Sequence, residues 1–125
     1  MYIIGKIDIS IYSCVTNDII TEDVIITDER IQHIKERHPN DFERYCSYIS
    51  YMLEKPDYIF QSDRPNTAFV MNSFTDNGKN FALILHLQTS SDDSRYKNSI
   101  ITFLKISDRK KAKYLRNKKI LYKSE

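Results

Sequence analysis

The sequence predicts an α+β fold in which helices come first and a sheet follows. Three observations predict this class: helical spacing of apolar residues before Pro56, four β-rich segments after it, and an Asn-Gly pair between two of those segments. The chain has 125 residues and a mass of 14.8 kDa, and it contains no internal repeat and no linker. We therefore expect one domain over residues 1–125.

The N-terminal third predicts two strands and a helix. Residues 6–11 alternate polar residues with isoleucine, a period typical of a half-buried strand, and residues 24–26 form a second β-rich run. Thr27 can then accept the free N–H groups of a helix start, and the two acids after it suit the positive end of the helix dipole. This helix is expected to end at His38, because Pro39 restricts the residue before it.

A second helix is expected from Asn40 to about Lys55. Asn40 and Glu43 have the spacing of a capping box, and Pro56 ends the helix. One stripe of this helix faces the core, because apolar residues recur at intervals of three and four: Phe42, Tyr45, Cys46, Ile49, Met52 and Leu53.

Beyond Pro56 the apolar pattern changes to that of four antiparallel strands, at residues 58–60, 67–74, 81–88 and 99–106. The second and third strands are separated by Asp76, Asn77 and Gly78, and Asn-Gly tolerates the positive φ angles of a tight hairpin turn. The sheet is expected to be covered by helices on one face.

The C-terminal part predicts a basic helix and an edge strand. Residues 89–93 form a polar loop before the last strand of the sheet. Ser107 and Asp108 can start a short basic helix that runs to about Asn117, and residues 120–122 can close the chain as an edge strand.

The net charge of +2 is unevenly distributed. From Arg95 to Glu125 there are 11 lysines and arginines against two acids, a net charge of +9, whereas residues 1–94 carry a net charge of −7. A basic segment on an acidic domain is typical of proteins that bind phosphate backbones, because each cation near a phosphate releases counterions. A solvated, lysine-rich helix would give the same count, so charge alone leaves both interpretations open.

Several protein classes are excluded by composition. Hydrophobic residues make up 41% and charged residues 29%, with only two glycines, which excludes collagen-like and wholly disordered chains. No apolar run approaches the roughly 18 residues of a membrane helix, and early charges argue against a signal peptide, so a cytoplasmic protein is expected. Cys14 and Cys46 form neither a disulfide framework nor a metal set, and glycine-rich phosphate loops and Gly-x-Ser-x-Gly are missing. We expect no cofactor and no metal.

A small set of polar residues suits acid-base chemistry on a phosphate: His33, His38, His86, Arg30, Arg37, Ser99, Thr102 and Lys105. Helical geometry places His38 on the core side of the first helix, and the adjoining stripe holds both arginines and His33. Each histidine also has a structural interpretation. His38 could be a hydrogen-bonded core residue, His33 could simply face solvent, and His86 could lie on a solvated sheet surface.

Alternation along the last two long strands predicts which side chains share a face. Thr102 is expected on the side of Ile100, Leu104 and Ile106, and the opposite face holds Ser99, Ile101, Phe103 and Lys105. In the strand before it, His86 lies on the less apolar face. A histidine, a hydroxyl and a lysine on neighbouring strands of an open face could bind and cleave a phosphodiester.

Five segments occur in an order found in one nuclease superfamily: residues 26–39 (ITDERIQHIKERHP), 56–59 (PDYI), 66–67 (NT), 97–103 (KNSIITF) and 119–122 (KILY). Over residues 25–122 the chain resembles the phage-associated branch of the barnase/EndoU/colicin/RelE-like (BECR) ribonuclease superfamily. The segments H-I-x-x-R-H-P and N-S-I-I-T are the most specific parts. Residues 1–24 lie outside the resemblance and are expected to form an N-terminal strand extension.

The resemblance implies two helices packed on a four-stranded antiparallel sheet, and a metal-independent endoribonuclease that often acts as a toxin or phage effector. Attack by a ribose 2′-hydroxyl would give a 2′,3′-cyclic phosphate, so DNA should not be cleaved. RNA, with tRNA as one candidate, would be the substrate, and an antitoxin or immunity protein would be a partner. His38 is implied as a general acid or base, with Arg30, His33 and Arg37 in the same motif, and Asn98, Ser99 and Thr102 in the strand motif.

Contacts with flanking phosphates are expected from the basic C-terminal segment, through Lys97, Asn98, Arg109, Lys110, Lys113 and Arg116. Two other classes of function stay open at this point. One is a non-catalytic nucleic-acid-binding module that uses the same basic surface, and the other is a protein-interaction domain that masks another nuclease.

Overall fold

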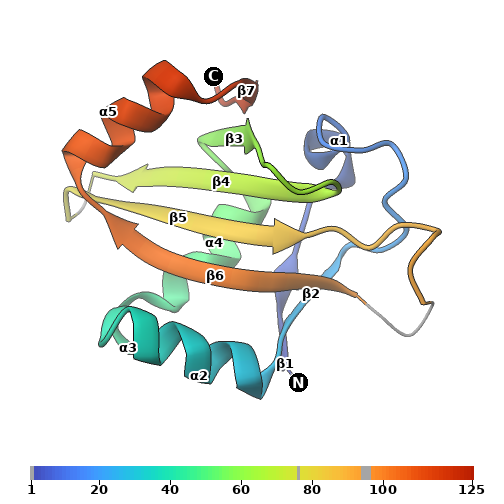
Figure 1. The fold of residues 1–125 in the computed structure, drawn as a ribbon, viewed down its shortest axis with the longest axis horizontal. Helices are drawn as coiled ribbons and strands as arrows, with labels where there is room; N and C mark the ends of the chain where they lie inside the picture. The colour runs from blue at the N-terminus through green and yellow to red at the C-terminus, as the bar shows by residue number, and fades with distance from the viewer. Residues whose placement is uncertain (1, 76, 94–96) are drawn as a thin grey trace.

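The structure is a computed structural model that describes residues 2–75, 77–93 and 97–125. Its described part contains a mixed seven-stranded sheet in the order β1-β2-β6-β5-β4-β3-β7 (Figure 1). The strands are β1 (Tyr2–Lys6), β2 (Asp23–Ile26), β3 (Tyr58–Gln61), β4 (Thr67–Phe74), β5 (Lys79–His86), β6 (Asn98–Ile106) and β7 (Ile120–Lys123). The helices are α1 (Ile9–Tyr12), α2 (Asp28–Arg37), α3 (Asp41–Tyr45), α4 (Ser47–Glu54) and α5 (Asp108–Asn117).

The α+β class is confirmed, but the sheet is larger than the sequence predicts. The four expected strands form its centre as β3, β4, β5 and β6, and they pair in antiparallel fashion. The expectation of a four-stranded sheet is wrong because the strands predicted at residues 24–26 and 120–122 join it as β2 and β7, and β1 extends it beyond β2. The sheet is mixed because β2 pairs in parallel with the start of β6.

Local capping explains the two helices that were predicted well. The Thr27 hydroxyl accepts a hydrogen bond from the Arg30 N–H at 3.1 Å and starts α2, as expected. The Ser107 hydroxyl accepts one from the Lys110 N–H at 3.1 Å and starts α5. Gly78 takes a φ of 67° in the turn between β4 and β5, whereas Asp76 of the predicted turn lies outside the described residues.

Two predictions from the N-terminal half are wrong. The strand expected at residues 6–11 is replaced by the end of β1 and by α1, because the Asp8 carboxylate accepts from the Ser10 N–H at 3.0 Å and caps a helical turn. The helix expected from Asn40 is split into α3 and α4 at Cys46. Asn40 makes no capping bond from its side chain and has a φ of 72°, so the predicted capping box does not form.

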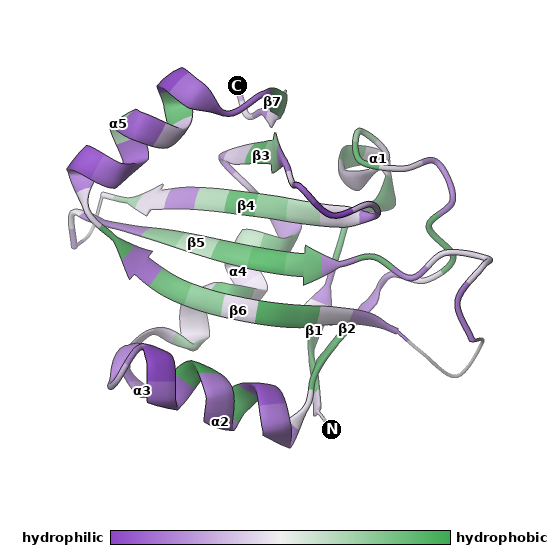
Figure 2. Cartoon of the chain, in the orientation of Figure 1, coloured by the Kyte–Doolittle hydropathy of each residue, from purple (hydrophilic) through white to green (hydrophobic). Residues whose placement is uncertain are grey.

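The core lies mainly between the sheet and the early helices. Phe81, Leu83 and Leu85 of β5 are fully buried, together with Ile34 of α2 and Met52 of α4. Figure 2 shows that the central strands are predominantly hydrophobic, whereas α5 is hydrophilic along nearly its whole length. In keeping with this, α5 contains no buried residue.

The opposite face of the sheet is covered only in part. A smaller cluster there contains Phe60, Met71, Ala82 and Ile106, and α5 packs on it through Tyr114 and Leu115. The rest of this surface, which we call the open face, carries Ile84, His86, Ser99 and Thr102, all half-buried. In Figure 1 it lies between α5 above and α2 below.

A β-bulge in β6 decides which side chains reach the open face. Ile84 pairs with Thr102, but the next residue, Leu85, pairs with Ile100, so Ile101 is the extra residue. The predicted alternation is therefore wrong at this point. Ser99 shares the face of Thr102, and the buried Ile100 lies on the core side of the sheet.

Candidate functional site

The C-terminal end of α2 is fixed at the free edge of β6. Only Asn98 and Ser99 of β6 pair with β2, and α2 and α3 lie along the remainder of the strand. There the Lys105 N–H donates to the Asp41 carboxylate at 3.2 Å, and the Asp41 N–H donates to the His38 carbonyl at 3.2 Å. One side-chain contact thus ties the end of α2 to the end of β6.

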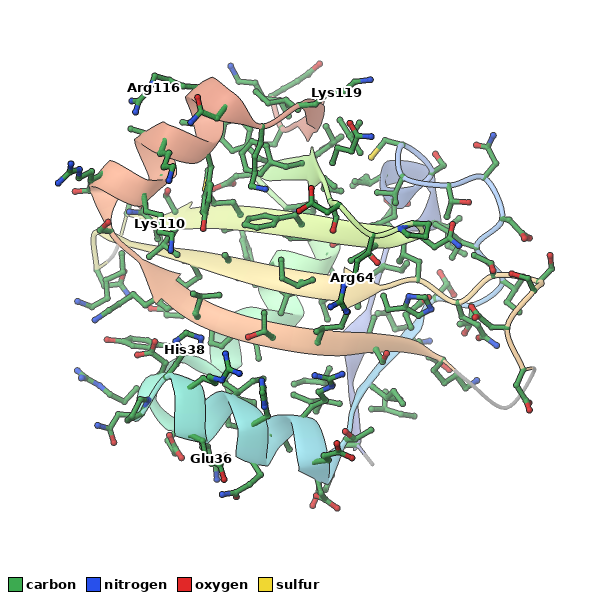
Figure 3. All side chains as sticks on the ribbon, in the orientation of Figure 1. Glu36, His38, Arg64, Lys110, Arg116 and Lys119 are labelled. Atoms are coloured by element: carbon green, nitrogen blue, oxygen red, sulfur yellow. The ribbon has the colours of Figure 1, made fainter. Side chains whose placement is uncertain are left out.

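His38 occupies the C-terminal cap of α2. Its N–H donates to the Ile34 carbonyl at 2.8 Å, as expected for a helix that stops before a proline. In Figure 3 its side chain rises toward β6, whereas Glu36 points away from the sheet. Within the described residues, the half-buried imidazole has no side-chain hydrogen bond or ion pair.

The remaining residues of the α2 motif lie on its outer side. Arg37 is exposed, and Arg30 and His33 are half-buried. Arg30 and His33 line a shallow depression together with Glu29, Gln32 and Glu36. This stripe is therefore of mixed charge, and Arg37 is its cation nearest to His38 in the sequence.

The open face brings two predicted hydroxyls and one predicted histidine together. His86 pairs with Ser99, and Ile84 beside it pairs with Thr102, so all three polar side chains point to the same side. His86 Nε2 lies 3.5 Å from Asp92 Oδ2, in the loop that follows β5. His38 and His86 lie at opposite ends of this face, since His38 is fixed near Lys105 and His86 lies opposite Ser99.

Three predicted site residues do not join the others. Lys105 shares the face of Phe81 on the helix side, with its Nζ 6.0 Å from the centre of the Tyr45 ring. Lys97 forms an ion pair with Asp23 at 3.6 Å. Asn98 is fully buried, which corrects its assignment as an RNA contact.

The amide of Asn98 instead has a structural role. Its oxygen accepts from the Gln88 N–H at 2.8 Å, and its nitrogen donates to the Thr21 carbonyl at 2.8 Å. These bonds connect the end of β5 with the segment before β2.

The basic helix α5 separates its cations by face. Its inner side is held to the sheet by Lys111, which donates to the Ser73 hydroxyl at 2.7 Å, and by Asp108, which accepts from the Asn80 amide at 2.7 Å. The outer cations are exposed and line one depression: Arg109, Lys110, Lys113 and Arg116. In Figure 3, Lys110 lies on the side of the open face and Arg116 points away from the sheet.

The described residues contain no group of three or more His, Cys, Asp or Glu side chains placed to hold a metal ion. None of their helices is long and apolar enough to cross a membrane.

Comparison with known proteins gives a family. Residues 3–123 match the model of the phage-Barnase-EndoU-ColicinE5/D-RelE like nuclease 2 family. The chain belongs to this nuclease family. The match covers nearly the whole chain. It therefore includes residues 3–24, which lay outside the resemblance found from the sequence segments. Neither a curated protein nor a solved structure shows a significant match.

Sequence reasoning missed three residues of this nuclease-like chain that border the open face or its cations. Asp92 contacts His86, and Lys118 has its Nζ 4.7 Å from the centre of the Phe69 ring. Arg64 lies in the loop before β4, and in Figure 3 it extends over the end of β5. The sequence predicts a polar loop that includes Thr89 and Asp92. No local pattern in the sequence indicates which residues this loop contacts in the fold, or where the Arg64 side chain lies.

Proposed function

We propose that the protein is a metal-independent endoribonuclease whose cleavage centre lies where the end of α2 meets the open face. One observation carries the proposal. α2 packs along β6, with the contact between Asp41 and Lys105 at its end, and the His38 side chain rises toward the strand that carries Thr102 on the open face (Figure 3).

The reaction suited to these groups is an internal transfer at phosphorus. The ribose 2′-oxygen forms a bond to phosphorus while the bond from phosphorus to the 5′-oxygen breaks. The proton of the 2′-hydroxyl goes to a base, and an acid gives a proton to the departing 5′-oxygen. The products are a 2′,3′-cyclic phosphate and a free 5′-hydroxyl, and water takes no part in this step.

The residues take distinct roles in this reaction. His38 supplies one of the two proton transfers, for which an imidazole is suited near neutral pH. Arg37, the cation of the motif nearest to His38 in the sequence, stabilises the charge that builds on the phosphoryl oxygens. Thr102 donates a hydrogen bond from its hydroxyl, and Ser99 can do the same for the neighbouring nucleotide.

The outer cations of α5 provide affinity in this proposal and take no part in bond cleavage. Arg109, Lys110, Lys113 and Arg116 are exposed along one side of the helix, and phosphate contacts of this kind position a strand without reading its sequence. A role as a toxin or effector that acts on RNA such as tRNA, and is held inactive by an inhibitor protein, belongs to the same proposal. Isolation of the protein from its native host with any bound partner tests that part.

Incubation of the purified protein with RNA and with a DNA oligonucleotide, with and without EDTA, tests the reaction. We expect cleavage of RNA alone, cyclic phosphate ends, and no loss of rate in EDTA. Cleavage of DNA, or loss of cleavage in EDTA, would contradict the mechanism. Salt-sensitive RNA binding without any product would instead favour a non-catalytic nucleic-acid-binding module.

A further inference from the structure

The loop that holds Asp92 beside His86 is anchored on two sides. The Asp92 carboxylate accepts from the Thr89 N–H at 2.9 Å, and Thr89 is only 2% exposed. Ser90 donates to the Asp18 carboxylate through its N–H at 3.1 Å and its hydroxyl at 2.6 Å. The Thr89 bond holds the pKa of the Asp92 carboxyl below its ordinary value, and His86 acts in the same direction. Asp92 is therefore a charged group in a fixed position.

This carboxylate orients the His86 imidazole without burying it. The distance of 3.5 Å between Nε2 and the carboxylate directs that edge of the ring toward the loop, while 38% of the His86 side chain stays exposed. In the protonated imidazole, the other ring nitrogen, Nδ1, also carries a proton and can donate it to a ligand. Because Asp92 already orients the His86 imidazole, the side chain loses little conformational freedom when an anion binds.

An arginine lies at the same end of the sheet. The loop from β3 to β4 is attached there because the Leu87 N–H donates to the Asn66 carbonyl at 2.8 Å. The exposed Arg64 and the buried Thr67 line one hollow, which His86 does not line, and Thr67 is the β4 neighbour of His86. Figure 3 shows the Arg64 side chain extending over the end of β5, where His86 is located.

We propose that His86, positioned by Asp92, and Arg64 form a second phosphate subsite, which binds the RNA backbone away from the scissile linkage. The assignment of RNA as the ligand rests on the proposed function, but the subsite itself is defined by its own residues. His86 and Arg64 contact the phosphate, and Asp92 acts through His86 as a positioning residue.

Two of the other charged groups around this end are already engaged. Asp18 is bound by Ser90, and Lys97 is paired with Asp23 at 3.6 Å. Asp63 is the neighbour of Arg64 in the loop and is exposed. Among the residues that the structure describes, Arg64 is an exposed cation on the loop that is bonded to the end of β5.

We place the subsite at a different phosphate from the one at the His38 centre. Lys105, to which the end of α2 is tied, lies six residues beyond Ser99, which corresponds to roughly 17–20 Å along a bulged strand. A dinucleoside monophosphate has one phosphate and can fill only one of the two positions. Longer RNA can fill both.

The test compares these two substrates and adds an RNA carrying 2′-O-methyl groups, which cannot be cleaved by internal attack. We expect His86→Gln and Arg64→Gln each to weaken binding of the methylated RNA by about three- to tenfold. Arg64→Gln should also reduce the slope of log affinity against log salt by about 0.7, the value for one phosphate contact on a single strand. Cleavage of the dinucleoside monophosphate should not change.

Asp92→Asn keeps the size of the side chain and removes its charge. We expect a smaller loss, about two- to threefold in affinity for the methylated RNA, with recovery in Asp92→Glu and no effect on the dinucleoside monophosphate. Glu54→Gln and Lys55→Gln are matched controls, because both residues are exposed at the end of α4, on the other side of the sheet.

Unchanged binding in both His86→Gln and Arg64→Gln would overturn the subsite, and so would an equal loss of cleavage on the short and the long substrate. If no RNA is cleaved by any variant, the proposed function fails. Binding of the methylated RNA then still decides whether the subsite exists.

Discussion

The two ends of the open face hold histidines in opposite environments. At the end of α2, His38 is fixed through its backbone, and no carboxylate orients its imidazole among the described residues. At the end of β5, His86 faces Asp92, a carboxylate fixed by Thr89. A carboxylate fixes the orientation of an imidazole, and the proposed phosphate subsite uses this at His86. The proposed role of His38 is instead a proton transfer, at the other end of the same face.

The largest effect is expected for His38→Ala. RNA cleavage should fall by about 100-fold or more, the usual contribution of a general acid or base, while the free energy of unfolding changes by less than about 1 kcal/mol. Single-turnover rates and urea unfolding curves measure the two quantities. Gln32→Ala, an exposed change on the same helix, is the control. Equal losses of activity and stability would restore the core-histidine interpretation.

A smaller effect is expected for Thr102→Val, which keeps the shape and β-branching of the side chain and removes the hydroxyl. Loss of one hydrogen bond to the phosphate should lower the cleavage rate about tenfold. The control is Thr75→Val, since Thr75 is exposed beyond the end of β4. If the two variants cleave at the same rate, the open face takes no part in the reaction.

A loss confined to binding is expected when Lys110 and Lys113 are both changed to alanine. Affinity for RNA should fall and the salt slope should become shallower by about 1.4, that is, about 0.7 for each phosphate that the helix no longer neutralises. Single-turnover cleavage at saturating RNA should be nearly unchanged. The pair Lys6→Ala and Lys55→Ala removes the same charge from another exposed region. An unchanged salt slope in the α5 variant would show that this helix does not contact RNA phosphates.

The smallest effect concerns pH. The pKa of Asp92 is lowered in the folded protein, mainly by the Thr89 N–H, so its contribution to stability is present above the ordinary value of 3.8. This contribution is lost as pH falls through the lowered pKa. Urea unfolding at about pH 6 and at about pH 2.5 should therefore show a slightly smaller loss of stability for Asp92→Asn than for the unchanged protein. Identical losses would show that the Thr89 bond does not stabilise the charged carboxylate.

Local signals explain what the sequence predicted correctly. Thr27, Ser107 and Gly78 act within a few residues of themselves, and the elements that they start or turn lie where the sequence places them. The placement of Ser99 and Thr102 on one face depends on a bulge that alternation does not reveal. The burial of Asn98 depends on Gln88 and Thr21, which lie far from it in the sequence.

The same reasoning explains what the sequence predicted poorly at the candidate site. The motif around His38 is local and was identified, whereas the position of Arg64 over β5 and the contact of Asp92 with His86 arise from how loops meet in the folded sheet. The mixed sheet was missed for a related reason, because parallel pairing of β2 with β6 joins segments separated by most of the chain.

A double-mutant cycle of His38→Ala and Thr102→Val on single-turnover RNA cleavage tests most directly whether α2 and β6 form one catalytic centre. Residues that act on the same phosphate are expected to be coupled, so the double variant should be clearly less impaired than the product of the two single losses. If the loss of rate in the double variant equals the product of the two single losses, within the error of about 0.5 kcal/mol expected for independent sites, a shared centre would be contradicted.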